Sequence, residues 1–111
     1  MKSYREFVRM SCKNLGPWNC SAHESRIYGC ALELIGEAGE VMEILQKASR
    51  DRGGRLTPED RENLVDELGD VLWGVTAMAD LLKVGPGQLA AANRKKLEKR
   101  IAARARAITP E

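Results

Sequence analysis

The sequence predicts an all-α protein, an antiparallel bundle of three main helices with a short helix at its N-terminus. Apolar residues recur every three or four positions through most of the 111 residues, which is the helical period, and no strand-like alternation interrupts them. Gly53-Gly54 and Gly85-Pro86 break the pattern and mark short turns. The length fits one domain covering residues 1–111. Helices joined by short turns pack antiparallel, so a small bundle follows.

The first expected helix begins after Ser3, whose hydroxyl can cap it, and ends near Lys13. Residues 16–25 read as a loop, which includes His23. No long apolar segment opens the chain and none reaches the length of a membrane span, so neither a signal peptide nor a transmembrane helix is expected. Three cysteines without paired spacing favour a reducing compartment, and we expect a cytoplasmic protein.

Two long helices are expected over residues 25–50 and 57–83. The first carries a continuous apolar arc, and the second begins at a strong start signal in which Thr57 caps the helix and Pro58 takes its first position. The second helix also carries two apolar stripes and therefore needs two partners. One partner is the core of the monomer, and the other is a subunit interface or a ligand wall. The main stripe holds Leu64, Leu68, Val71, Leu72, Val75, Ala79 and Leu82, and the smaller one Trp73, Ala77 and Leu81.

A fourth helix is expected over residues 88–107, and it is basic. Residues 24–80 hold 13 acidic and 6 basic residues, whereas residues 83–111 hold 8 basic and 2 acidic ones. An acidic middle and a basic end suit a metal site that faces a phosphate clamp. The weaker alternative is a footprint for nucleic acid.

The most informative pattern is a pair of acidic couples at i,i+3 spacing on two different helices. Glu37 and Glu40 form the first couple, and Glu67 and Asp70 form the second. Residues three apart project from one side of a helix, so each couple repels itself unless a cation lies between its members. Both couples border an apolar stripe, and interior glycines beside them favour close approach of a helix or a ligand.

Four converging carboxylates predict a site for a hard divalent cation, Mg²⁺ first and Mn²⁺ as the alternative. A di-iron carboxylate bundle is the rival interpretation, but it requires Glu-x-x-His couples, and the single histidine of this chain lies outside the expected helices.

A polar edge on the fourth helix supplies the complementary chemistry. Asn93, Lys96 and Arg100 lie along it, and they provide an amide, a point charge and a forked donor for a triphosphate. Lys47, at the end of the 25–50 helix, either joins this clamp or complements the helix dipole. Trp73 either stacks on a base or fills a subunit interface.

The runs GEAGEV, ELGDVLW and NRKKLEKR contain these residues, and together they resemble the MazG-like all-α nucleoside triphosphate pyrophosphohydrolases. The resemblance covers about residues 27–101. It departs at Gly74, where related sequences often have Tyr as a wall beside the sugar, so a roomier sugar site is implied.

The resemblance implies a Mg²⁺-dependent enzyme that cuts a nucleoside triphosphate between its α and β phosphates, in nucleotide-pool housecleaning. It also implies a bundle completed by dimerisation, as a homodimer or a dimer of dimers. The motif carboxylates would hold the metal, with Glu37 or Glu40 as general base, and Asn93, Lys96 and Arg100 would contact the nucleotide. Alternatives are a phosphoribosyl-ATP pyrophosphohydrolase, a non-catalytic basic module that binds nucleic acid, and a purely structural oligomerisation bundle.

Overall fold

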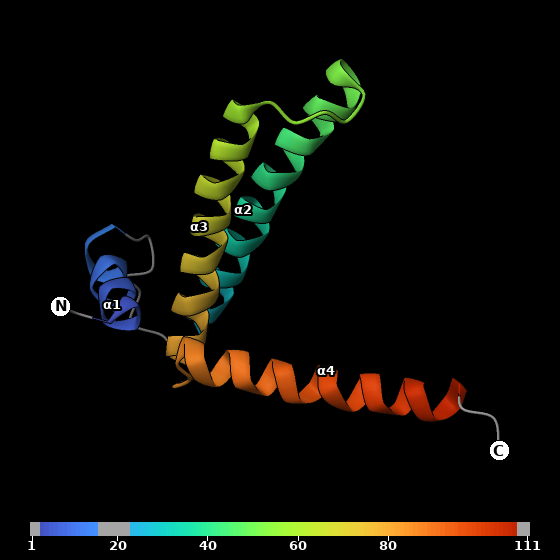
Figure 1. Ribbon diagram of the computed structural model, residues 1–111. Coiled ribbons are helices and arrows are strands. Elements are labelled where there is room, and N and C mark those ends of the chain that lie inside the picture. Colours follow the sequence, from blue (N-terminus) through green and yellow to red (C-terminus); the bar gives the residue numbers. More distant parts are fainter. Residues whose placement is uncertain (1–2, 16–22, 109–111) are drawn as a thin grey trace.

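The computed structural model describes residues 3–15 and 23–108, which form four helices and no strand (Figure 1). They are α1 (Tyr4–Leu15), α2 (His23–Arg52), α3 (Pro58–Leu81) and α4 (Pro86–Ile108). The predicted all-α class is therefore confirmed. Among the described residues, no helix combines the length and apolarity needed to cross a membrane.

Two helices, α2 and α3, lie side by side as a long antiparallel hairpin (Figure 1). Gly53 and Gly54 make its turn at φ of +61° and +86°, a region that glycine adopts without strain. The N–H of Gly54 donates to the carbonyl of Ala48 at 3.0 Å, which closes the end of α2. Thr57 then caps α3 in a reciprocal capping box with Asp60, as its position in the sequence predicted.

The hairpin is held together by a seam of residues spaced alternately three and four apart. Such heptad-like spacing keeps one stripe of each helix facing the other. All of the residues in this seam are buried or half-buried. On α2 the seam holds Ile27, Cys30, Leu34, Glu37, Val41, Ile44 and Ala48, and on α3 it holds Leu64, Glu67, Val71, Gly74 and Met78.

The short helix α1 packs against α3 rather than against the turn of the hairpin. Val8 of α1, Cys30 of α2 and Ala77 of α3 form the buried core of this contact. Ser3 caps α1 by accepting from the N–H of Glu6 at 3.2 Å, which agrees with the predicted helix start. This contact therefore joins all three helices at the foot of the hairpin.

Two polar contacts fix α1 on α3. Arg5 and Arg9 both bind the carboxylate of Asp80 at 2.7 Å, and Trp73 donates its indole N–H to the hydroxyl of Ser11 at 2.8 Å. The second apolar stripe predicted for α3 thus has α1 as a partner within the chain.

The orientation of α4 differs from the predicted antiparallel packing. After Lys83, which takes a φ of +63°, the chain turns and α4 projects away from the foot of the hairpin (Figure 1). Within the described residues, α4 has its main contact with α3 and buries none of its own residues. Its apolar stripe is consequently exposed, with Ile101 69% and Ile108 71% accessible.

The main stripe predicted for α3 is also only partly covered, because Leu68, Leu72 and Leu82 are 54%, 50% and 57% accessible. The radius of gyration is 18.2 Å, whereas a compact chain of this length would have about 13 Å. Its accessible surface is 8638 Å², against about 6100 Å² for a compact protein of this mass. The described fold is an open one with apolar faces left uncovered.

The loop predicted over residues 16–25 is shorter in the structure, and most of it lies outside the described residues. The helix α2 begins at His23, so that histidine is helical and not part of a loop, while its side chain lies outside the described part. Residues 16–22, the rest of the predicted loop, also lie outside the described residues.

The anchor at Asp80 predicts a loss of stability in acid. Two guanidinium groups lower the pKa of Asp80 to about 2 from its ordinary 3.8. A lowered pKa stabilises the fold above about pH 4, and this contribution disappears as the pH falls from about 4 towards 2. Asp80→Asn should cost on the order of 1–2 kcal/mol at pH 7.

Chemical denaturation at several pH values measures this effect. The difference in unfolding free energy between the wild type and Asp80→Asn should shrink between pH 4 and pH 2. A difference that stays constant over that range would contradict the role of the ion pairs.

Candidate metal and nucleotide site

The site begins with two glutamates that occupy seam positions otherwise filled by apolar residues. Glu37 of α2 and Glu67 of α3 are both half-buried between the helices. Their carboxylates and that of Asp70 place one oxygen each within 4.8 Å of the others. The i,i+3 couples predicted from the sequence are thus brought together by the antiparallel hairpin.

Glu40 is the fourth predicted carboxylate, and it joins the same cluster. It interacts with Glu37 on its own helix and with Glu67 across the seam. Residues 40 and 70 each lie three positions after a seam residue, and in an antiparallel pair this offset puts both on the same side of the hairpin. The cluster therefore opens towards one side of the hairpin.

The proximity of these groups raises the pKa of two of them. The pKa of Glu67 rises to about 7, first because its protonated form can donate to Glu40, then through burial and the charges of its neighbours. Burial is the first cause of the raised pKa of Glu37, followed by the charges of Glu40 and Asp70. When all four carboxylates are ionised, they repel one another unless a cation lies between them.

The cluster fits a hard divalent cation on the chemistry of its atoms. Glu37 and Glu67 each bury an Oε2 atom that receives no hydrogen bond from the described residues. Buried oxygens of this kind normally have a partner, and a cation would supply one. All the ligands are carboxylate oxygens, which suits Mg²⁺ or Mn²⁺.

The predicted phosphate clamp lies elsewhere in this chain. Asn93 and Lys96 line a cleft of about 550 Å³ between α3 and α4, together with apolar residues such as Leu72 and Leu89. Leu72 follows Asp70 by two residues, which is about 200° around the helix. The clamp and the carboxylates therefore occupy opposite sides of α3. Arg100, two turns further along α4, is exposed.

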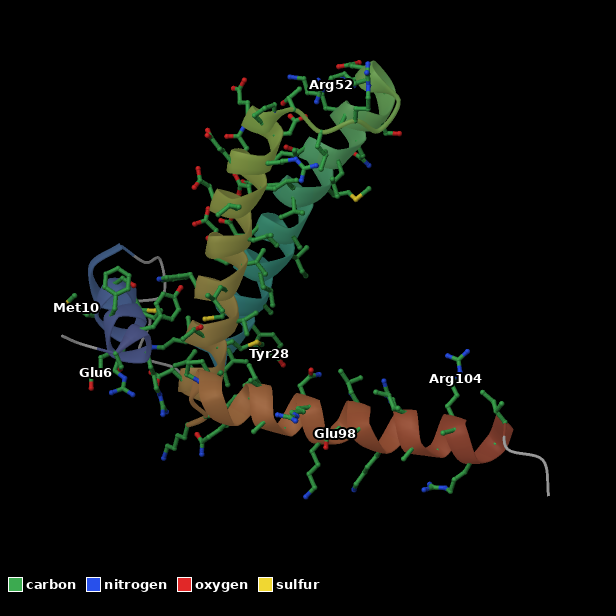
Figure 2. The ribbon with its side chains drawn as sticks, viewed as in Figure 1. Glu6, Met10, Tyr28, Arg52, Glu98 and Arg104 are labelled. Carbon is green, nitrogen blue, oxygen red and sulfur yellow. The ribbon has the colours of Figure 1, made fainter. Side chains whose placement is uncertain are left out.

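Lys47 occupies a different position from the clamp on α4. It follows Glu40 by seven residues, so it lies on the same face of α2 about 10 Å further along the axis. There it lines a polar cleft of about 270 Å³ with Arg52, Thr57 and Asp60. Figure 2 shows Arg52 at the tip of the hairpin, where it binds Asp60.

Two positions near the site have roles that the sequence did not reveal. Trp73, predicted as a base or interface contact, packs against the α1 core and donates to Ser11. Gly74 lies buried in the seam, where an added Cβ would make ordinary van der Waals contact with Leu34 at 3.7 Å. Around Gly36, Gly39 and Gly69, in contrast, the chain leaves open space.

Tyr4 also belongs to the surroundings of the cluster, and sequence analysis missed it. Burial raises the pKa of its phenol first, and the negative charge of Asp70 raises it further. The only sequence signal was an aromatic residue at the start of a helix whose docking position was unknown.

Comparison with known proteins agrees with this geometry. The MazG nucleotide pyrophosphohydrolase domain matches residues 29–104, which include all four carboxylates and Asn93, Lys96 and Arg100 of α4. The chain is also 38% identical over 85 residues to the Gene 37 protein of Mycobacterium phage L5, covering 77% of this chain and 74% of that protein. No solved structure matched significantly. The chain therefore belongs to the MazG nucleotide pyrophosphohydrolase family.

Proposed function

We propose that this protein hydrolyses nucleoside triphosphates between the α and β phosphates, releasing a monophosphate and pyrophosphate, with Mg²⁺ as cofactor. The observation that carries the proposal is the cluster of Glu37, Glu67 and Asp70 at the seam of a MazG-family hairpin. Buried carboxylates without donors have no structural benefit in a small hairpin, because apolar residues would stabilise the seam better. Their presence is explained by a bound cation and its substrate.

The chain's own residues divide the remaining work. Glu37, Glu40, Glu67 and Asp70 would hold Mg²⁺, which supplies positive charge to neutralise the phosphates during the reaction. Glu40 is exposed on the open side of the cluster, and it would remove the proton from the attacking water as general base. Glu37 is the alternative base, because burial and the charges of Glu40 and Asp70 raise its pKa above the ordinary value, which makes its carboxylate more basic.

The leaving pyrophosphate requires cations, and we assign these to Lys96, Arg100 and Lys47. A second copy of the chain is needed to bring α4 to the carboxylates, because the clamp of one chain lies on the far side of its own α3. The uncovered apolar stripe of α4 and the exposed face of the hairpin, which includes Ile35 at 69% accessibility, supply a surface for such a dimer. Glycines with open space beside the acids leave room for a partner or a nucleotide.

The excess of accessible surface over a compact chain is about 2500 Å² per chain, or about 5000 Å² for two chains, which is at the upper part of the range that obligate homodimers bury. We therefore propose a homodimer, or a dimer of dimers, with each site shared between two chains. Free nucleotides are the substrates of such an enzyme, so we place it in the cytoplasm in a housecleaning role.

A second candidate function is nucleic-acid binding by α4, favoured by its full exposure and its basic residues. Figure 2 shows Arg104 extending from this helix into solvent. The acidic cluster opposes this function because carboxylates repel a phosphate backbone. A phosphoribosyl-ATP substrate is the alternative within the enzyme proposal.

Product analysis tests the reaction and the base together. A panel of ribo- and deoxyribonucleoside triphosphates is incubated with the protein and Mg²⁺, with and without EDTA, and the products are separated by chromatography. Monophosphate and pyrophosphate should appear, and EDTA should abolish them. Glu40→Gln should lower kcat by about 100-fold or more while retaining the helical circular dichroism spectrum.

The matched control is Glu43→Gln, which removes an exposed acid one turn away on α2 and should retain the wild-type rate. Wild-type turnover by Glu40→Gln would exclude Glu40 as the base. Failure to turn over any nucleotide of the panel, phosphoribosyl-ATP included, would overturn the proposed reaction.

Metal binding predicts a change in thermal stability that depends on Glu67. At pH 8 without metal, Glu67→Gln should unfold at the wild-type temperature or a few degrees above it, because one of several repelling charges is gone. Saturating MgCl₂ should raise the Tm of the wild type by a few degrees and leave Glu67→Gln unchanged.

Differential scanning fluorimetry measures both effects, and Asp66→Asn is the control because Asp66 is an exposed acid beside Glu67. That variant should keep the Mg²⁺ response. An equal Mg²⁺ response in Glu67→Gln would show that the cation binds away from the cluster.

The shared site predicts complementation between two inactive variants. The Glu67→Gln variant lacks a metal-binding carboxylate, and Lys96→Ala lacks a cation that binds the pyrophosphate. Each homodimer should therefore have low activity. Co-refolded mixtures contain heterodimers with one intact site, and about a quarter of the wild-type rate should return. Light scattering and mass spectrometry confirm that the mixture contains heterodimers. If such a mixture gains no activity, the metal-binding and phosphate-binding residues of a site belong to the same chain.

A further inference from the structure

We propose that Tyr4 and Phe7 of α1 form the wall on which the nucleobase of the substrate stacks. This inference rests on the proposed function and adds the part of the site that selects the nucleoside. The family match begins at residue 29, after α1, so this wall would be contributed by a part of the chain outside the matched domain.

The first argument is the side of the hairpin on which α1 lies. Trp73 and Ala77 of α3 contact α1, and Asp70 begins the same stripe one turn earlier, because residues 70, 73 and 77 follow helical spacing. The stripe that leads into the carboxylate cluster therefore continues beneath α1. The clamp-bearing cleft on the α4 side faces the other way.

The second argument is that both aromatic side chains keep a large part of their surface open to solvent. Docking uses Val8, Ser11 and the Asp80 ion pairs. Tyr4 and Phe7 remain 40% and 49% accessible. Figure 2 shows Met10 and Glu6 on the side of α1 that faces away from the hairpin, so the exposed surface of this helix is not uniformly apolar.

The third argument is the arrangement of the rings themselves. The ring centroids of Tyr4 and Phe7 are 6.3 Å apart with an interplanar angle of 32°, so the two rings form one continuous aromatic surface. Tyr4 is close enough to Asp70 for the carboxylate charge to act on its phenol. The aromatic surface therefore flanks the metal cluster without entering it.

The order of phosphate, sugar and base in a nucleotide fits this placement. One sugar separates the α-phosphate, which must reach the metal, from the base, so a base wall belongs beside the cluster. Stacking on aromatic rings is favourable for every base.

Steady-state kinetics with the full chain tests the wall. Tyr4→Ala and Phe7→Ala should raise KM for the preferred nucleotide by about tenfold, with kcat changed less than twofold. Inorganic tripolyphosphate, which has phosphates but no base, should inhibit the wild type and both variants with the same Ki. Tyr4→Phe, which retains the ring, should keep a KM within about twofold of wild type, and Tyr28→Ala is the control at an aromatic 73% exposed on α2.

The outcomes separate this inference from the proposed function. An inactive wild type would reject the proposed function itself. An active wild type whose KM is unchanged in both alanine variants would reject only the wall. If Tyr4→Ala and Phe7→Ala raised the Ki of tripolyphosphate by the same factor as KM, the substitutions would have displaced α1. The aromatic pair would then have a structural role, which also rejects the wall. A changed oligomeric state with unchanged KM would show that the aromatic pair is a subunit contact, which also rejects the wall.

Discussion

The structure depends on an electrostatic conflict in the seam of its hairpin. Glu37 and Glu67 stand at positions that the heptad-like spacing assigns to core residues. Their carboxylates lie close to that of Asp70 and interact with that of Glu40. The pKa of Glu67 rises to about 7, first because its protonated form can donate to Glu40, then through burial and the charges of the neighbouring carboxylates. A fold that carries such a repulsion in its main packing seam is organised for binding, because the bound cation removes the cost of the unbound state.

The rest of the fold is arranged so that this conflict does not open the hairpin. Below the cluster, α1 clamps the foot of the hairpin through Val8 and the ion pairs of Asp80. Above it, Arg52 binds Asp60 beside the capped start of α3. Apolar seam residues on both sides complete the support. Four carboxylates can thus stay close together because both ends of the hairpin are fixed by contacts independent of the metal.

Local features of the sequence predicted the helices and the convergence of acidic residues from two of them. The capping of α3 by Thr57 and the turn at Gly53 depend on neighbouring residues only, and the i,i+3 acidic couples need just one antiparallel hairpin to converge. Long-range contacts were not predictable in the same way. The partner of Trp73 lies 62 residues away at Ser11, and the helix period does not report which of several helices covers a stripe. The direction of α4 is set at Lys83, whose positive φ no residue type in the turn foretold.

The open shape of the chain and the chemistry of its site have the same cause. Each chain presents carboxylates on one side of α3 and amide and cationic groups on the other, so neither set alone can bind a triphosphate and neutralise its charge. A compact monomer would bring both sets together only by folding α4 back over the hairpin, which would cover the carboxylates. In the proposed dimer, the apolar stripe of α4 would have its partner in the other chain and would carry the cations with it. Under that proposal assembly and catalysis are one property, and the exposed leucines and isoleucines of the single chain would belong to the site as much as its glutamates.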